Sequence, residues 1–301
     1  MRHLAIDAGQ TGIRTVIVTD GVRAPEGELP GILTSEPLLP QLATVITGAA
    51  AGGRIDLVSI GSTGLTADET DPAGLRDATE QHGVTRVLMA HDSVTSYLGA
   101  LGDQRGAVVA AGTGVVTLAV GDKVVARVDG WGNLLGDAGA GYWIGRAALE
   151  AVMRAHDGRG PATALTARAQ AEFPDLEEAY IVLQGDPGRV RRIAAYTKAV
   201  AELAPTDEVA AGICAAAARE LALSVATGLA RVGEAELTSP VVCGIGGVLR
   251  APEIARPFEA ELRQRWELVD IRTPHGSGID GAALLPDVPA TSALYRLIAS
   301  S

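Results

Sequence analysis

The sequence contains few aromatic residues and few cysteines. Aromatic side chains make up 3% of the 301 residues, so the interior has to be built mainly from Ala, Val, Leu and Ile, within a hydrophobic total of 47%. Its two cysteines, Cys214 and Cys243, lie in Ala- and Val-rich segments. They have neither metal-ligand spacing nor the numbers for a disulfide framework, so we expect buried, reduced thiols.

Positive charge and long apolar runs are also scarce. The 25 Lys and Arg residues stand against 36 Asp and Glu residues, which gives a formal net charge of −11. This balance argues against nucleic acid and against an anionic membrane surface as partners. The first residues lack the apolar segment of a signal peptide, and no run approaches the roughly 18 apolar residues of a membrane span. We therefore expect a cytoplasmic protein that does not bind membranes.

Several familiar catalytic motifs are missing as well. The sequence has no Walker A lysine motif and no Gly-x-Ser-x-Gly elbow. Instead, glycine-bearing turns follow four predicted strands, at Gly9, 61–64, 112–114 and 244–247. Because open α/β sheets gather their ligands at the carboxyl ends of strands, these turns indicate that several strand ends converge on one ligand.

Strand and helix patterns alternate along the chain, which predicts an α/β fold. Strands are expected at 4–7, 15–19, 57–60, 86–89, 106–111, 116–120, 123–128, 240–243 and 268–272. Helices are expected at 41–49, 73–82, 141–156, 162–171, 189–204, 209–232, 253–265, 278–285 and 291–298, and a loop at 24–40.

The unit of strand, glycine turn and strand that opens the chain recurs from residue 106 onward, which indicates an internal duplication. Together with the chain length, it predicts two domains. We place them at 1–104 and 105–288, with a terminal helix in 289–301 that packs back on the first domain.

The stretch LAIDAGQTGIR at 4–14 is the most informative segment. Its hairpin tip carries little side-chain bulk, so backbone N–H groups can approach a phosphate closely. Asp7 cannot bind the anion itself, but it can hold through water the Mg²⁺ that accompanies a nucleotide. An ordinary glycine turn is the alternative interpretation.

Asp92 follows the strand predicted at 86–89 and precedes a helical pattern. A carboxylate at this position is placed to accept the proton of an attacking hydroxyl in phosphoryl transfer. A plain N-cap aspartate is the alternative.

Residues 130–141, GWGNLLGDAGAG, hold five glycines and one tryptophan. This much backbone freedom is more than a helix-capping loop usually needs. Asp137 can accept two hydrogen bonds from the hydroxyls of a sugar, and the exposed amides can supply further contacts.

Taken in order, these motifs resemble a known family. IDAGQTGIR, HDS, AAGTGVV, GWGNLLGDAGAGYWIG and CGIGGVL follow the sequence order of N-acetylglucosamine kinases. Those enzymes form part of the BadF/BadG/BcrA-type branch of the sugar kinase, heat-shock 70 and actin superfamily. The resemblance spans nearly the whole chain. It implies two ribonuclease-H-like domains with ATP in the cleft between them, and a homodimer.

The resemblance also implies roles for individual residues. Asp92 resembles the catalytic base, acting on the 6-OH of the sugar. The nucleotide side comprises Asp7, Gly9, Gln10, Thr11, Gly12, Gly112, Thr113, Gly114, Gly244, Gly246 and Gly247. The sugar contacts comprise Ser62, Thr63, Gly64, Asp92, Gly130, Trp131, Gly132 and Asp137.

Two departures leave other functions open. The family carries a sugar-binding Asn after the first hairpin, but residues 24–40 contain no Asn, and Val115 and Val116 replace polar residues after the second phosphate turn. A non-catalytic binder of sugar or nucleotide with the same fold is one alternative. An ATPase activator with an iron–sulfur cluster is another, although the two cysteines lack the context that such a cluster requires.

Overall fold

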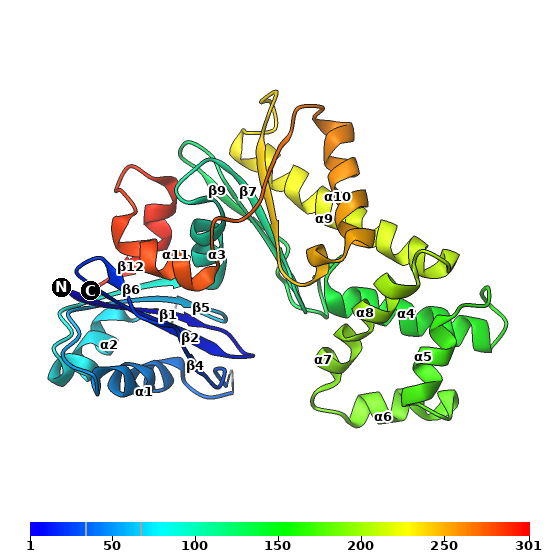
Figure 1. The fold of residues 1–301 in the computed structure, drawn as a ribbon, viewed down its shortest axis with the longest axis horizontal. Helices are drawn as coiled ribbons and strands as arrows, with labels where there is room; N and C mark the ends of the chain where they lie inside the picture. Colours follow the sequence, from blue (N-terminus) through cyan, green and yellow to red (C-terminus); the bar gives the residue numbers. More distant parts are fainter. Residues whose placement is uncertain (34, 67) are drawn as a thin grey trace. The chain divides into compact units, whose positions relative to one another are not determined.

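The computed structural model describes residues 1–33, 35–66 and 68–301. The chain forms two compact units, each with its own mixed sheet and helices, which confirms the predicted α/β class with two sheets (Figure 1). Unit 1 comprises Met1–Arg105, Val120–Val125 and Thr273–Ser301, and unit 2 comprises Gly106–Ala119 and Ala126–Arg272.

Unit 1 is built on a seven-stranded sheet with the order β12-β6-β5-β1-β2-β3, in which β4 also pairs with β2. The strands are β1 (Arg2–Ala8), β2 (Ile13–Thr19), β3 (Val22–Arg23), β4 (Gly27–Leu29), β5 (Leu57–Ser62), β6 (Arg86–His91) and β12 (Ala299–Ser300). Strands β1, β5 and β6 run parallel, whereas the other pairs are antiparallel. The carboxyl ends of the three parallel strands therefore share one edge.

Helices cover both faces of this sheet, with α1 and α2 on one side and α3 and α11 on the other (Figure 1). They are α1 (Leu38–Ala50), α2 (Pro72–Thr79), α3 (Asp92–Leu101) and α11 (Gly278–Leu284), with 3₁₀ turns at Glu80–His82, Leu285–Asp287 and Ala293–Leu297. Side chains alternate along β1 accordingly. Leu4 and Ile6 join the core that includes Leu42 of α1, whereas Ala5 packs with Ile279 of α11.

Helices α3 and α11 touch backbone to backbone. A Cβ at Gly281 would overlap the carbonyl oxygen of Thr95, and a Cβ at Gly99 would overlap that of Ser277. The small residues of the helix predicted at 278–285 therefore serve this contact within unit 1.

Unit 2 is built on a five-stranded sheet with the order β11-β10-β7-β8-β9. The strands are β7 (Gly106–Ala111), β8 (Val115–Val120), β9 (Val125–Val128), β10 (Val241–Ile245) and β11 (Asp270–Arg272). The helices are α4 (Gly141–His156), α5 (Leu165–Glu172), α6 (Ala179–Gly185), α7 (Arg189–Ala194), α8 (Tyr196–Leu203), α9 (Glu208–Val232) and α10 (Pro252–Arg265), with 3₁₀ turns at Leu176–Glu178 and Val248–Arg250. A single large core, rich in Ala and Val, joins them.

Helix α9 corrects one expectation about apolar runs. With 25 residues and a mean hydropathy of 1.6 in its most apolar window, it is long and apolar enough to cross a membrane by those two criteria alone. Its inner face, which includes Cys214, Leu221 and Val225, is buried in the core of unit 2. Such burial is typical of a core helix.

Two further predictions from the local sequence pattern, the loop at 24–40 and the helix at 189–204, differ from the structure. Part of the loop predicted at 24–40 is strand β4, because the edge of β2 offers it a partner through the pair Thr15 and Gly27. The helix predicted at 189–204 is two helices, α7 and α8, that meet at Ala195. A Cβ at Gly145 of α4 would overlap the carbonyl oxygen of Ile193, so contact with α4 shapes this junction.

The end of the chain also differs from its prediction. The predicted second domain extends to residue 288, but α11 packs on β1 and places residues 273–288 in unit 1. The expected terminal helix is a short 3₁₀ turn followed by β12, which pairs with β6 through Ala299 and Met89. Long-range strand pairing of this kind leaves no local sequence signal.

Candidate active site

The hairpin tip between β1 and β2 forms the floor of a pocket in unit 1. The amide of Gly9 donates to the carbonyl of Gly12 at 3.0 Å and closes the turn. The pocket has a volume of about 420 Å³ and is lined by Asp7, Gly9, Thr11, Gly12, Ile13, Arg14, Glu28 and Leu29. Most of the predicted first phosphate loop thus faces one cavity, whereas Gln10 is not part of its lining and its backbone carbonyl lies against Gly31.

Asp7 pairs with Arg14, a residue that the sequence reasoning did not single out. The two face each other across the hairpin, and Arg14 Nη2 lies 2.5 Å from Asp7 Oδ2. Burial raises the pKa of Asp7 above its usual value, and the Arg14 guanidinium opposes that rise without cancelling it. The side chain of Asp7 is 16% exposed and that of Arg14 40%. The alternation of β2 would have placed Arg14 opposite Asp7 once the turn length was known.

The strand ends of unit 1 bring three predicted segments together. Asp7 pairs in register with Gly61, and Ser62 pairs with His91, the residue before Asp92. The Asp92 carboxylate is close enough to Asp7 to raise the pKa of Asp7 further. The predicted metal-associated carboxylate and the predicted base therefore share one sheet edge.

Asp92 is the first residue of α3 and its carboxylate remains accessible. Its Oδ1 lies 2.8 Å from Nδ1 of His91, and 33% of its side chain is exposed. The same His91 nitrogen accepts from the backbone N–H of Ser93 at 3.2 Å, so it caps the helix in place of Asp92. Because His91 caps the helix, the interpretation of Asp92 as a plain N-cap residue is disfavoured.

The segment 62–64 follows β5 at the same edge. The Ser62 hydroxyl donates to the carbonyl of Thr63 at 3.0 Å, and the Thr63 amide donates to Ala8 at the end of β1 at 3.0 Å. Gly64 has φ +68, which favours glycine. The turn is thus tied directly to the strand that carries Asp7.

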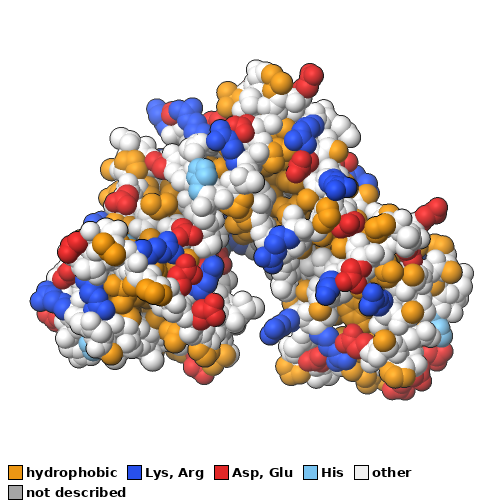
Figure 2. Space-filling model, in the orientation of Figure 1, with side chains coloured by type: hydrophobic (Ala, Val, Ile, Leu, Met, Phe, Trp, Pro, Cys, Tyr) orange, Lys and Arg blue, Asp and Glu red, His pale blue; other side chains and the backbone are white. Residues whose placement is uncertain are grey.

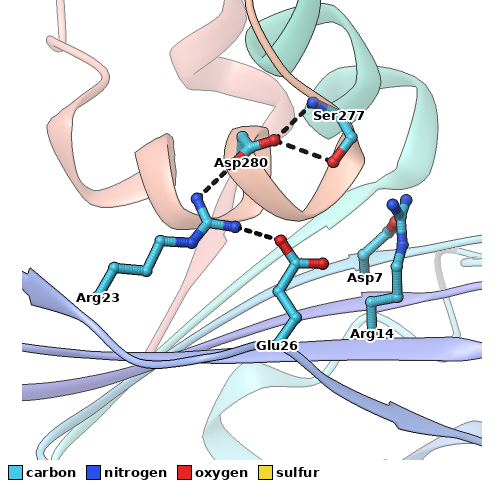
Figure 3. A network of polar contacts seen from close by, with 6 residues as sticks. All are labelled: Asp7, Arg14, Arg23, Glu26, Ser277 and Asp280. Atoms are coloured by element: carbon cyan, nitrogen blue, oxygen red, sulfur yellow. Dashed lines mark hydrogen bonds and ion pairs between the residues drawn. The ribbon is translucent and has the colours of Figure 1, made fainter.

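A network of charges surrounds the start of α11 (Figure 3). Asp280 accepts from the backbone and the hydroxyl of Ser277 and from Arg23, which also pairs with Glu26 at 2.7 Å. Burial raises the pKa of Asp280, but the hydrogen bonds from Ser277 and Arg23 outweigh it, so the pKa is lowered overall. This network fixes the start of α11. That end of the helix lies against Asp7, since a Cβ on Gly278 would lie 2.9 Å from Asp7 Oδ2.

In unit 2, the turn at Gly112–Gly114 links β7 to β8 and holds the start of α4. The carbonyls of Gly112 and Thr113 accept from the amides of Gly141 and Tyr142 at 2.8 and 3.0 Å. A second turn lies against the first, since Gly246, with φ +99, leaves no room for a Cβ beside the carbonyl oxygen of Ala111. Two turns that are far apart in sequence therefore touch.

These turns open into a cavity in unit 2 with a volume of about 860 Å³. Its lining includes Gly112, Thr113, Gly141 and Gly247, together with small apolar residues of α7, α8 and α10 and the charged residues Arg191, Lys198, Glu202, Arg250 and Glu253. Charges of both signs are also interspersed on the molecular face seen in Figure 2. Local groups, rather than a field of one sign, would therefore orient an anionic ligand here.

The glycine-rich loop of residues 130–139 presents Trp131 to solvent and buries Asp137. Trp131 is 61% exposed, and the Arg127 guanidinium lies 5.0 Å from its ring centroid. The backbone N–H groups of Val115 and Gly132 hydrogen-bond to the Asp137 carboxylate, and burial raises the pKa of Asp137 despite them. A carboxylate has about four acceptor positions, so these two bonds leave capacity for a ligand hydroxyl.

The cysteines carry no site chemistry. Cys214 and Cys243 are buried, and burial raises the pKa of each thiol to about 11. Across residues 1–33, 35–66 and 68–301, no group of three or more His, Cys, Asp or Glu side chains is arranged to hold a metal ion. Protonated, buried thiols are poor ligands for an iron–sulfur cluster.

Comparison with known proteins finds a matching family and related sugar kinases. The sequence profile described as the BadF/BadG/BcrA/BcrD ATPase family matches residues 4–285. An N-acetylmuramic acid/N-acetylglucosamine kinase of Clostridium acetobutylicum is 30% identical over 110 residues, which is 36% of each chain. An N-acetyl-D-glucosamine kinase of Dictyostelium discoideum is 45% identical over 69 residues, which is 23% of this chain and 22% of the relative.

Among solved structures, a protein from Chromobacterium violaceum assigned as an N-acetylglucosamine kinase superposes with a TM-score of 0.72 at 25% identity. The superposition covers 94% of this chain and 98% of that one. The sequence matches to the two curated relatives thus span about a third or less of their lengths, whereas the structural match spans nearly the whole chain.

Proposed function

The chain belongs to the BadF/BadG/BcrA/BcrD ATPase family, and from this premise we propose that it is an ATP-dependent sugar kinase. The acceptor is an amino sugar or a related hexose, in line with the N-acetylglucosamine kinases that it resembles in sequence and in fold.

One observation carries the proposal: the turns at Gly112–Gly114 and at Gly244–Gly247, separated by more than a hundred residues, meet at one cavity in unit 2. The amides of a glycine turn can cradle the phosphates, and the small apolar side chains of α8 and α10 can accept the base and ribose. In this assignment Thr113 and Gly114 lie beside the phosphates, and Gly247 lies beside the adenosine.

Asp7 fits the role of a magnesium partner. Mg²⁺ in phosphoryl-transfer sites is commonly held by one or two carboxylates, with phosphate and water oxygens completing its shell. Asp7 supplies one such carboxylate at the base of the hairpin pocket, and Arg14 occupies one of its oxygens. When bound, Mg²⁺ would neutralise charge on the phosphates.

Asp92 acts as the general base in this proposal. Its exposed carboxylate takes the proton of the sugar 6-OH, and the hydroxyl oxygen bonds to the γ-phosphorus. The bond from that phosphorus to the bridging oxygen breaks, and ADP leaves. Ser62, Thr63 and Gly64, at the same strand edge, and Gly130, Trp131, Gly132 and Asp137 of the glycine-rich loop orient the sugar.

A coupled ADP-release assay with ATP and Mg²⁺ tests this function on a panel of hexoses, N-acetylated amino sugars and small polyols. We expect sugar-dependent turnover, with the phosphate on O6 of the product by ³¹P and ¹H NMR. Turnover no faster than that of Asp92→Asn with every acceptor would reject kinase activity on this panel.

The acceptor loop supports one competing function. Because residues 24–40 lack the Asn that the family uses for the sugar, a binding protein without catalysis is the alternative. Calorimetry and the turnover assay together separate the two: tight binding of nucleotide or N-acetylglucosamine without turnover favours the non-catalytic binding protein, whereas turnover with any acceptor excludes it.

A further inference from the structure

Asp129 joins the two ends of the glycine-rich loop. It lies directly after β9, and its Oδ1 accepts from the amides of Gly130 and Asp137, each at 2.8 Å. Its Oδ2 accepts from the amide of Ala138 at 3.0 Å, and the amide of Trp131 approaches Oδ1 at 3.5 Å. One carboxylate thus binds backbone groups at both the beginning and the end of the loop.

The loop needs such a clamp because its backbone is unusual. Asp129, Gly130, Gly132 and Asp137 have φ values of +58, +78, +80 and +60. Left-handed conformations of this kind are costly for residues other than glycine. Hydrogen bonds to an ionised carboxylate are about twice as strong as neutral ones and can offset that cost. Gly136 also packs against Asp129 Oδ1, since a Cβ there would overlap it.

Hydrophobic packing cannot supply this order. The large apolar side chains of the loop face solvent: Trp131 is 61% exposed, Leu134 88% and Leu135 86%. Exposed loops with little buried apolar area usually sample many conformations. The contacts that define this loop are therefore mostly polar. The Asp129 carboxylate makes more of them than the Arg127 guanidinium does.

Arg127 completes the arrangement around Trp131. Its guanidinium donates to the carbonyls of Asp129 and Gly130 and lies 5.0 Å from the Trp131 ring centroid. Arg231 of α9 in turn donates to the Arg127 carbonyl at 2.8 Å. Trp131 is thus linked through Arg127 and Arg231 to helix α9.

We propose that Asp129 is a positioning residue for the sugar. Its carboxylate holds residues 130–138 in the binding conformation before the substrate arrives. This inference rests on the proposed function, in which Gly130, Trp131 and Gly132 contact the sugar. A ligand that binds a preformed loop does not lose affinity to loop ordering. Asp129 also sets the position of Asp137, whose carboxylate receives N–H groups from Gly132 and Val115.

The carboxylate of Asp129 is not placed for chemistry of its own. Its acceptor positions are directed at backbone amides, so it has little capacity left to take a substrate proton. Among the residues that the structure covers, it also belongs to no metal-binding group of three or more side chains. Asp129 therefore acts through the loop and not on the reacting atoms.

Asp129→Asn is the sharpest test, because its amide keeps one acceptor oxygen and turns an NH₂ group toward a backbone N–H. We expect the KM for N-acetylglucosamine, or for the best sugar of the panel, to rise roughly 10- to 100-fold. We expect kcat at saturating sugar and the KM for ATP to stay within about threefold. Asp175→Asn is the matched control, since Asp175 accepts one backbone amide in an exposed turn of the same unit.

Hydrogen exchange supplies a readout that does not need activity. In Asp129→Asn the amides of Gly130, Asp137 and Ala138 should exchange at least about tenfold faster, while those of β7 and α9 keep their protection. Asp129→Ala should go further in the same direction. If the loop loses protection but the sugar KM stays unchanged, the positioning role is wrong although the clamp is real.

The remaining outcomes are equally decisive. Unchanged exchange in both variants would overturn the clamp itself. Global loss of protection would show a general folding role in place of sugar positioning. A wild-type protein that phosphorylates no sugar, yet shows the local exchange effect, would overturn the proposed function and with it the sugar as the occupant of the loop.

Discussion

Asp7 and Arg14 face each other across the β1–β2 hairpin, with 2.5 Å between Oδ2 of the aspartate and Nη2 of the arginine. Burial raises the pKa of Asp7 even so, because the Arg14 guanidinium offsets only part of the cost of desolvating the charge. A hairpin proposed to hold phosphates and a metal thus keeps a carboxylate that is costly to ionise.

This pairing predicts a conflict between stability and activity at Asp7. A raised pKa in the folded state means that ionised Asp7 costs stability once the pH rises above the range in which the unfolded chain titrates. We expect Asp7→Asn to raise the midpoint of thermal unfolding at pH 7 and to lower kinase turnover. Near pH 3, where Asp7 is protonated in both states, the difference in midpoint should shrink. A lower midpoint at pH 7 than in the wild type would contradict the prediction.

The second prediction concerns Asp92. Removing a general base typically costs about 10²- to 10⁴-fold in rate, so Asp92→Asn should lower kcat by that amount. Calorimetry with a non-hydrolysable ATP analogue and Mg²⁺ should give a dissociation constant close to that of the wild type. Asp77→Asn, at an exposed aspartate of α2, is the control and should behave as the wild type. Near-normal turnover of Asp92→Asn would mean that another group takes the proton.

The third prediction concerns the contact of the two turns in unit 2. Gly246 has φ +99 and no room for a Cβ beside Ala111, so Gly246→Ala must separate the turns. The strained conformation alone costs on the order of 1–3 kcal/mol. We expect weaker ATP binding by calorimetry and a lower thermal midpoint.

Two further glycines make this test specific. Gly247→Ala also lies at the cavity but meets only the flexible Arg250 side chain at 3.4 Å, so it should keep the thermal midpoint of the wild type while its added methyl group weakens ATP binding beside the adenosine. Gly185→Ala, where a Cβ meets nothing within 4 Å, should leave both stability and binding unaltered. Equal ATP affinity in all three variants would mean that these turns do not form part of the nucleotide site.

The fourth prediction is a pH dependence of stability from His3. Its Nε2 lies 2.6 Å from the Ser59 hydroxyl, which donates to the carbonyl of Ala282 in α11 at 2.6 Å. Burial lowers the pKa of His3 below 6.5, although Asp287 opposes this. Between the folded and unfolded pKa values the unfolded chain binds more protons, so stability rises with pH in that window.

Chemical denaturation at pH 7.5 and pH 5.5 measures this effect. The wild type should lose free energy of unfolding as the pH falls through about 6.5, the value expected for an unperturbed histidine. His3→Gln, which can still donate to Ser59, should lose less over the same interval. The same pH dependence in both proteins would assign it to other groups.

Much of the fold could be predicted because its signals are local. Helix α4 has the predicted bounds, Gly141–His156, and the cores of β1, β5 and β7 coincide with predicted apolar runs. Apolar periodicity and glycine turns are patterns of consecutive residues, so they can be recognised without knowledge of any long-range contact. Strand β4 and the junction of α7 with α8 were missed, since each depends on a neighbour that is distant in sequence.

The candidate site divides in the same way. The hairpin glycines, Asp92 and the glycine-rich loop stood out by composition and spacing. The roles of Arg14 and Asp129 did not, because a single charged residue beside a loop has no distinguishing pattern until its partners are known. Asp137 was identified as a sugar contact, but its bonds to Val115 and Gly132 appear only in the folded chain.

The sequence by itself determined the order of strands, glycine turns and helices, and with it the α/β class and the family. Only the tertiary structure decided which turns share a cavity, which carboxylates are buried and which amides each of them binds. The reason is physical: hydrophobic period and turn chemistry act between neighbours along the chain, whereas burial, pKa and backbone clamping depend on groups that meet only after folding.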